Sequence, residues 1–298
     1  MRSSLRSAAV LSALFAVVLG LHVVQARAGG QTGAGRGESL LYVQSPEIAR
    51  RAALSYDSLV ADLYWIRAVQ YYGRTKLAPG ETKRYELLYP LLDFTTSLDP
   101  HFDVAYRFGA TFLAEPSPGG AGRPDQAIAL LEKGLTAQPD KWQFVGDIGF
   151  IHYFWLKDYV GAAEWFRRAS MMPQGPEWMA ALAATVLHEG GNSASSRRLW
   201  QDILEGDNPP YLRERARRGL QQLDAIDQLA ALNRIVSAYA LRTGHPPTSW
   251  RALGAAGYLR QIPEDPSGTP YQIDSSTGEV MLSPDSSLLP LPKTEHAP

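Results

Sequence analysis

Apolar and small residues recur at helical spacing along most of this chain, and prolines end the runs. Residues 158–173 read DYVGAAEWFRRASMMP and show the pattern most clearly. Ala162, Phe166 and Ala169 are four and three residues apart, so they lie on one face of a helix. Pro173 then stops the run, because a proline cannot continue a helix interior. The pattern predicts an amphipathic helix, which is either an isolated helix or the second helix of a stackable two-helix unit.

The same termination recurs at a nearly constant interval, which favours the stackable unit. Prolines stand at Pro100, Pro139, Pro173 and Pro209, so that 39, 34 and 36 residues separate neighbours. A period near 34 residues is typical of helical repeats in which each unit is one helix pair. Because one pair cannot bury its apolar face alone, successive pairs must stack into a continuous core. We therefore expect stacked helix pairs over residues 41–213.

Small residues mark the places where these helices should cross. Upstream of the proline-terminated helices lie other apolar runs that contain Gly109, Gly149 and Ala183. A small residue at a crossing lets two backbones approach, and large side chains beside it fill the grooves. We predict that Phe166 is one such buried filler. The structural repeat positions are Pro100, Gly109, Ala127, Pro139, Gly149, Ala162, Phe166, Ala169 and Pro173.

These motifs resemble the tetratricopeptide repeat. LDPHFDVAYRFGATFLAE followed by DQAIALLEKGLTAQPD is the best match to its two-helix unit, and IGFIHYFWLKDYVGAAEWFRRASMMP is the next. The likeness covers about residues 55–209, and the linker EPSPGGAGRPD makes one unit six residues longer than the family pattern. The resemblance implies a mainly α protein, a TPR-like α-α solenoid of about four helix pairs. It also implies that the first helix of each pair lines a concave groove that binds proteins.

The resemblance further implies which side chains face that groove. If Ala68 is equivalent to the three small residues at the crossings, fixed offsets from these four residues give the groove positions. These positions are Asp62, Trp65, Asp103, Tyr106, Gln143, Phe150 and Glu177. Acids and aromatic rings favour a neutral or basic, partly apolar ligand, such as a peptide helix or an extended segment. The alternative is that the acids form a solvated face and that the aromatic rings belong to the core.

A different pattern follows the helical repeats. Residues 211–243 carry apolar side chains every three or four positions and predict one long helix, which Gly244 terminates. A short helix should come next. Two strands, Tyr271–Ile273 and Val280–Leu282, should then pair around a turn as a β-hairpin.

This arrangement resembles the globular part of type II secretion pseudopilins. The matching stretches are LAALNRIVSAYALRTGHPP, GYLRQIPEDPSGTPYQID and TGEV, in that order. We assign residues 214–284 to the long helix and a pseudopilin-like α+β module, and residues 285–298 to a disordered tail. In that family a loop can hold calcium, but Asp265 and Asp274 alone are too few ligands to predict a metal site. The alternative is a module that only caps the end of the solenoid.

The beginning of the chain reads as an export signal. Two arginines precede an apolar run over residues 8–24, and Ala26-Arg27-Ala28 fits the small-x-small cleavage pattern. We predict a signal peptide over residues 1–28, cleaved after Ala28, and a Gly-rich flexible linker over residues 29–40. The alternative is an uncleaved membrane anchor, because about 17 mostly apolar residues can just span a bilayer. The expected location is the periplasm or cell envelope, with transient membrane association through this segment.

Composition narrows the function further. A net charge of −1 over 298 residues gives no basic surface for nucleic acid, and the absence of cysteine excludes disulfides and thiolate metal sites. The chain carries no HExxH, GxSxG, P-loop or EF-hand motif. We therefore predict no catalytic residue, no metal and no cofactor. The predicted function is a scaffold or adaptor, not an enzyme, that binds an unidentified protein or peptide. The alternatives are an accessory factor of a type II secretion or type IV pilus-like machine, and a non-catalytic or substrate-binding subunit of a periplasmic enzyme.

Overall fold

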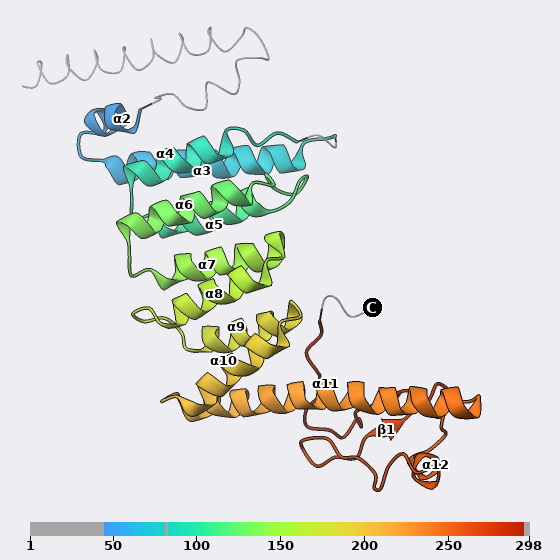
Figure 1. Cartoon of the computed structure of the whole chain (residues 1–298). Coiled ribbons are helices and arrows are strands. Elements are labelled where there is room, and N and C mark those ends of the chain that lie inside the picture. The colour runs from blue at the N-terminus through green and yellow to red at the C-terminus, as the bar shows by residue number, and fades with distance from the viewer. Residues whose placement is uncertain (1–44, 81–82, 295–298) are drawn as a thin grey trace, which may run out of the picture.

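The computed structural model describes residues 45–80 and 83–294, and these residues are mainly helical (Figure 1). The prediction of a mainly α fold is confirmed. The predicted signal peptide and linker, residues 1–28 and 29–40, lie outside the described residues. Among the residues that are described, no helix combines the length and the apolar composition that crossing a membrane requires.

Helices that follow one another in the chain pack against one another as successive pairs (Figure 1). A short helix, α2 (Pro46–Ala53), precedes the first pair. The paired helices are α3 (Asp57–Leu77) with α4 (Leu88–Leu98), α5 (Asp103–Ala114) with α6 (Pro124–Ala137), α7 (Trp142–Ile151) with α8 (Tyr159–Ser170), and α9 (Trp178–Glu189) with α10 (Ser193–Glu205). One π-helical turn, His152–Leu156, joins α7 to α8.

Local signals in the sequence explain where these helices begin and end. Asp158 caps α8, because its side-chain Oδ1 accepts the amide N–H of Gly161 at 2.9 Å. Asn192 caps α10 in the same way, accepting from the amide of Ser195 at 3.2 Å. Prolines follow the ends of α4, α6 and α8 within three residues, where they do not interrupt a helix.

Close crossings between the helices depend on residues without bulk. A Cβ added to Gly109 in α5 would lie 2.7 Å from a methyl of Leu92 in α4 and 3.2 Å from a methyl of Leu130 in α6. A Cβ on Gly149 in α7 would lie 2.7 Å from the ring of Phe166 in α8. Ala127, Ala162, Phe166 and Ala169, from the second helices, are all fully buried. The small and filler positions named from the sequence therefore lie at helix–helix contacts.

A lysine joins the first two helix pairs at the C-terminal end of α4. The Lys133 Nζ of α6 donates to the backbone O of Asp93 at 2.7 Å, to its carboxylate at 2.6 Å and to the Ser97 Oγ at 2.7 Å. Lys133 thus pairs with the Asp93 carboxylate and holds α6 beside the second half of α4.

The long helix α11 (Pro210–Thr243) belongs to two packing units. Leu212 and Ala216, in its first half, join the buried cluster of α9 and α10, while Val236 and Tyr239, in its second half, join the core of the C-terminal module. The predicted boundary between residues 213 and 214 lies inside this continuous helix. Gly244 adopts a positive φ of 82° and ends α11 as expected.

The C-terminal module packs along the second half of α11 (Figure 1). It holds a short helix, α12 (Trp250–Ala255), and two strands, β1 (Gln272–Ile273) and β2 (Val280–Met281), which pair antiparallel. Each strand is one residue shorter than predicted, but the hairpin is present. The side-chain amide of Asn233 in α11 clamps it, accepting the Val280 amide N–H at 2.9 Å.

The disordered tail predicted over residues 285–298 is wrong for residues 285–294. Ser286 and Leu288 are buried. The Gln222 Nε2 of α11 donates to the backbone O of Leu288 at 2.8 Å and of Pro290 at 3.0 Å. Polar donors on α11 thus bind the main chain of residues 285–294. The composition of that segment alone does not reveal these contacts. Residues 295–298 lie outside the described residues.

Candidate protein-binding surface

The first helices of three successive pairs lie side by side. The ring of Trp65 in α3 stacks on Phe112 in α5, with centroids 6.2 Å apart and planes 5° from parallel. The guanidinium of Arg107 in α5 donates to both carboxylate oxygens of Asp147 in α7, at 2.5 and 3.1 Å. These contacts join α3 to α5 and α5 to α7, so the outward sides of the three helices form neighbouring parts of one surface.

Helix α3 is apolar on two opposite sides. One side is buried and contains Ala61, Tyr64 and Ala68. The other side carries Leu59, Leu63 and Ile66, which are 57%, 50% and 49% exposed. A helix at the surface of a globular protein normally has one apolar face and one polar face. The second apolar side of α3 is therefore the feature of this surface that packing among residues 45–80 and 83–294 does not explain.

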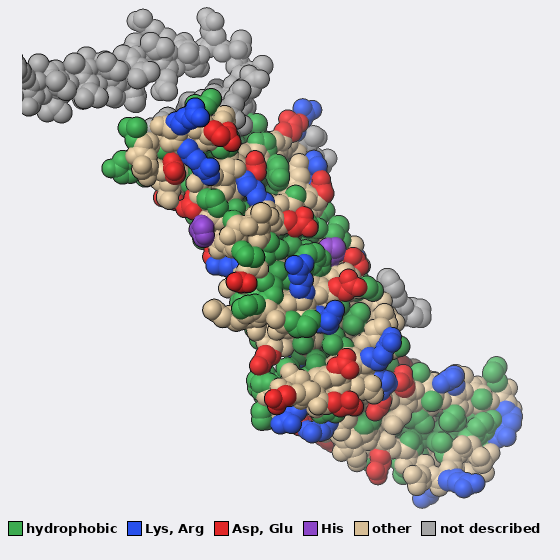
Figure 2. All heavy atoms as spheres, turned by 60° about the vertical axis from the view of Figure 1, so that its left-hand side comes forward, with side chains coloured by type: hydrophobic (Ala, Val, Ile, Leu, Met, Phe, Trp, Pro, Cys, Tyr) green, Lys and Arg blue, Asp and Glu red, His purple; other side chains and the backbone are tan. Residues whose placement is uncertain are grey.

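Helix α5 also carries exposed apolar side chains. Val104 is 45% exposed and Phe108 is 57% exposed, next to the half-buried Phe112. On the face of the stack shown in Figure 2, hydrophobic side chains lie between acidic and basic ones, so neither sign of charge dominates that face. We call the outward side chains Leu59, Leu63 and Ile66 of α3 and Val104 and Phe108 of α5 the docking face.

The aromatic residues predicted for the groove divide into two groups. Trp65 and Phe150 are half-buried, and each contacts further rings: Trp65 contacts Phe112, and Phe150 lies 4.9 Å from Phe166. Tyr106 was predicted to face a ligand, and this is wrong. Its side chain is fully buried, with the ring 5.2 Å from that of Phe144. The Tyr106 ring packs in the core against Gly134, whose lack of a side chain leaves space for it.

The polar residues predicted for the groove do not form one acidic cluster. Asp103 is bound by Lys141 and accepts from the Gln138 Nε2 at 2.9 Å, and Glu177 accepts from the Tyr211 hydroxyl at 3.3 Å. Asp62 is exposed and has no polar partner within the part of the chain that the structure describes. Gln143, the one uncharged side chain among the polar residues predicted for the groove, is half-buried. Asp62 is therefore the one predicted acid available to a ligand, beside the apolar side of α3.

Sequence reasoning did not single out the exposed aliphatic residues of α3, because hydrophobic periodicity identifies an apolar side without saying what covers it. The signal was nevertheless present. Leu59, Leu63 and Ile66 follow helical spacing, and so do Ala61, Tyr64 and Ala68, on the opposite side of the same helix. Two separate apolar stripes on one helix indicate two packing partners, and only one of them belongs to the described chain.

Burial shapes the electrostatics of the link between α5 and α7. Desolvation raises the pKa of the Asp147 carboxyl, and the hydrogen bonds from Arg107 offset only part of that effect. The same bonds raise the pKa of Arg107. Arg107 therefore remains charged beside Asp147, and the pair fixes the relative position of the two helices. Desolvation of the Asp147 carboxylate opposes this stabilisation.

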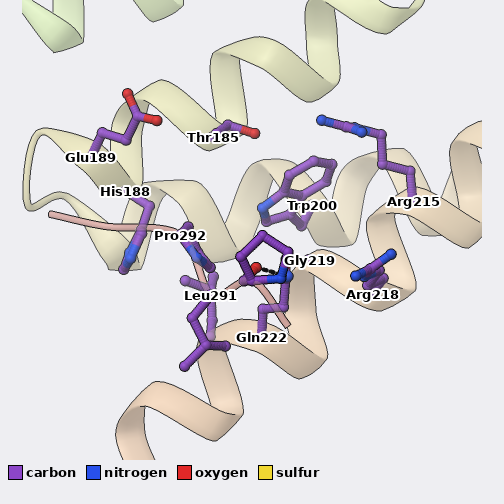
Figure 3. A pocket seen from close by; sticks show the side chains of 12 residues that line it. Thr185, His188, Glu189, Trp200, Arg215, Arg218, Gly219, Gln222, Leu291 and Pro292 are labelled. Carbon is purple, nitrogen blue, oxygen red and sulfur yellow. Dashed lines mark hydrogen bonds between the residues drawn. The ribbon is translucent and has the colours of Figure 1, made fainter. Parts of the chain in front are cut away.

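A separate cavity of about 340 Å³ lies between α9, α10, α11 and the C-terminal segment (Figure 3). Its lining includes Trp200, Arg215 and the 2%-exposed His188. The His188 Nδ1 lies 2.9 Å from the Ser193 Oγ, while its Nε2 has no hydrogen bond to any described residue. Burial lowers the pKa of His188, so the imidazole is neutral near pH 7. Among the described side chains, Ser193 is the one that hydrogen-bonds the His188 ring.

The two acids of the C-terminal loops are engaged by their own loops. Asp265 Oδ1 accepts from the amides of Ser267 and Thr269 at 2.8 and 3.1 Å, and Asp274 Oδ1 accepts from the Ser276 amide at 2.8 Å. Within residues 45–80 and 83–294, no group of three or more histidines or acids is placed to hold a metal ion. Both carboxylates thus act as turn-forming acceptors.

Comparison with known proteins finds no match for this chain, whether among family models, curated proteins or solved structures. Geometry and chemistry alone therefore describe the candidate site. They single out an uncharged, partly apolar surface on α3 and α5, flanked by Asp62.

Proposed function

We propose that this chain is an exported scaffold that binds another protein through the docking face on α3 and α5. In this proposal the helix pairs form a TPR-like solenoid, and the first helices present the surface. The observation that supports it most is the second apolar side of α3, where three aliphatic side chains are about half exposed. Single exposed apolar side chains are common on soluble proteins, whereas a group of them on one surface marks a site of interaction.

The chemistry of the surface favours a partner segment that is itself amphipathic. Fully burying a leucine, isoleucine or phenylalanine side chain contributes about 1.5–3 kcal/mol, so each half-exposed side chain has about 1 kcal/mol left to gain. Association costs offset much of that gain. A partner must therefore cover several of these side chains at once, as the apolar face of a helix does in a helix-in-groove complex.

A second candidate function is an accessory role in a type II secretion or type IV pilus-like machine. The observation that favours it is the C-terminal module, in which the second half of α11, α12 and the hairpin share a buried core of their own. The unit runs in the order helix, short helix and hairpin, which is the order that the sequence resemblance to pseudopilins implies. The module would then make the contact with the machine, and the docking face would hold the scaffold's other partner.

The export assignment is part of the same proposal, and it has a direct test. N-terminal sequencing of the protein recovered from the cell envelope should begin after Ala28. A product that retains the apolar run of residues 8–24 would instead support the membrane-anchored alternative.

Capture of partners by purified variants tests the docking face. Phe108→Ser and Val104→Ser remove exposed apolar side chains from the α5 part of the face, and Val160→Ser removes one of comparable exposure, 50%, from α8 outside the face. We expect the two docking-face variants to lose the envelope proteins that the unaltered chain captures, and Val160→Ser to keep them. Equal capture by all three variants would refute the proposal. Secretin or filament components among the captured proteins would support the accessory role.

A further inference from the structure

The outward side of α3 has the spacing of a coiled-coil seam. Its members are Leu59, Leu63, Ile66, Gln70, Gly73 and Leu77, at successive separations of 4, 3, 4, 3 and 4 residues. Alternation of three and four residues keeps one seam facing a partner helix over three heptads. A helix that only covers a globular core needs a broader and less regular stripe.

This seam is open along its length in the described structure. Leu77 is 86% exposed at one end and Leu59 is 57% exposed at the other. Between them, a Cβ added to Gly73 would meet no atom within 4 Å, and Gln70 is exposed. A single polar residue within an apolar seam is a device that fixes the register of two helices. The stripe is therefore continuous enough to receive a whole helix.

The charges beside the seam are complementary to those of the same helix. Asp62 lies on one flank of the seam, and Arg67, whose guanidinium sits 4.9 Å over the ring of Tyr64, lies on the other flank. In a parallel pair of helices, a residue on the first flank faces the residue five positions later on the second flank of the partner. Asp62 of one copy then meets Arg67 of the other, twice by symmetry. An antiparallel pair would instead place the flank that carries Arg67 and Arg74 against itself.

We propose that two copies of this chain associate through α3, which forms a parallel two-stranded coiled coil along this seam. The inference rests on the proposed function, since it names the partner that covers the α3 part of the docking face. The α5 part, around Phe108, stays free for a different protein. The assembly is then a dimeric scaffold with two equivalent binding surfaces.

Because the chain contains no cysteine, a disulfide formed by a single-cysteine variant must join the introduced thiols of two copies. Single-cysteine variants Leu59→Cys and Ile66→Cys place a thiol at the two ends of one heptad of the seam, and Val160→Cys is the control on α8. Under mild oxidation of the purified full chain, we expect both seam variants to form covalent dimers and the control to remain monomeric. Equal dimer formation by Val160→Cys and Ile66→Cys would overturn the proposal. So would cross-linking of Leu59→Cys only when it is mixed with Leu77→Cys, because that result requires antiparallel helices.

Sedimentation of charge variants provides a measurement that does not depend on cysteine. We expect Asp62→Arg to weaken dimerisation by about tenfold, because two symmetric ion pairs are lost and like charges face each other. Adding Arg67→Asp in the same chain exchanges the two charges and should restore the dimer. A dimer that is indifferent to Asp62→Arg, or a chain that is monomeric at every concentration, would contradict the parallel seam.

The two proposals can fail separately. If the chain is monomeric but Phe108→Ser still abolishes capture of an envelope protein, the scaffold function stands and the seam does not. If the seam cysteines cross-link but the docking-face variants capture the same proteins as the unaltered chain, self-association stands and the docking function of α5 does not.

Discussion

Substitution of Gly149 by alanine tests the helix crossing between α7 and α8. An added Cβ would lie 2.7 Å from two ring carbons of Phe166 and 3.3 Å from the Cβ of Trp165. Carbon atoms attract best at about 3.5–4.0 Å, so the ring must move by about 1 Å to accept the methyl. Phe166 is fully buried, and its ring lies 4.9 Å edge-on from Phe150, so it has no free space to enter. The helices themselves must therefore separate.

The magnitude follows from two opposing effects. Overpacking a well-packed core costs about 1–3 kcal/mol, and the rigid surroundings of Phe166 place this site near the upper end. Replacing glycine by alanine within a helix returns about 1 kcal/mol through helix propensity. We therefore expect Gly149→Ala to lower the free energy of unfolding by about 2 kcal/mol.

Urea unfolding followed by circular dichroism measures this change, and two further variants control it. Gly73→Ala in α3 has no atom within 4 Å of its new methyl and should raise the stability by up to about 1 kcal/mol. Phe166→Leu beside Gly149→Ala makes room for the methyl, so the double variant should lose less than the sum of the two single losses. A Gly149→Ala protein as stable as the unaltered chain would refute the close crossing.

Three further predictions concern other parts of the molecule. Arg107→Ala should lower the free energy of unfolding by about 1–2 kcal/mol, because Asp147 loses its partner at a site where burial disfavours its charge. Adding Asp147→Asn to the same chain should recover most of that loss, which a double-mutant cycle measured by thermal unfolding would show. Burial raises the pKa of Tyr106 from 10.0 to about 12, so this residue's contribution to the free energy of unfolding is complete below pH 10 and declines as the pH rises toward 12. In Tyr106→Phe, the free energy of unfolding should therefore fall less between pH 10 and pH 12 than in the unaltered chain, as measured by unfolding at a series of pH values. Gln222→Leu removes two hydrogen bonds to the C-terminal segment, each worth about 1 kcal/mol, and should therefore speed proteolysis of that segment. Gln221→Leu is the control, because it removes one hydrogen bond to Pro266 and should leave the rate of proteolysis of the C-terminal segment unchanged.

Local signals account for the parts of the fold that the sequence predicted. Ala162, Phe166 and Ala169 share one helical face, and a proline follows, so α8 and its buried side can be predicted from spacing alone. Gly244 ends α11 because a positive φ is easy for glycine. The hairpin strands were predicted to within one residue, since the turn between them is rich in residues that favour turns.

The rest depended on contacts between distant residues. Nothing in its own sequence shows that Tyr106 enters the core, because that depends on Gly134 of the next helix leaving space for the ring. The C-terminal segment was predicted to be disordered, yet donors about seventy residues away on α11 hold its carbonyls. The outward residues of α3 were not identified as a surface, because hydrophobic periodicity reveals an apolar side without saying what covers it.

The most direct test of the docking face is site-specific photo-cross-linking in cells that make the protein. A photoreactive side chain is placed at Phe108 on the docking face, or at Val160, which is of similar exposure on α8. The account predicts a discrete covalent adduct with another protein from position 108 and none from position 160. Adducts of equal yield from both positions, or none from position 108 while Val160 gives one, would contradict it.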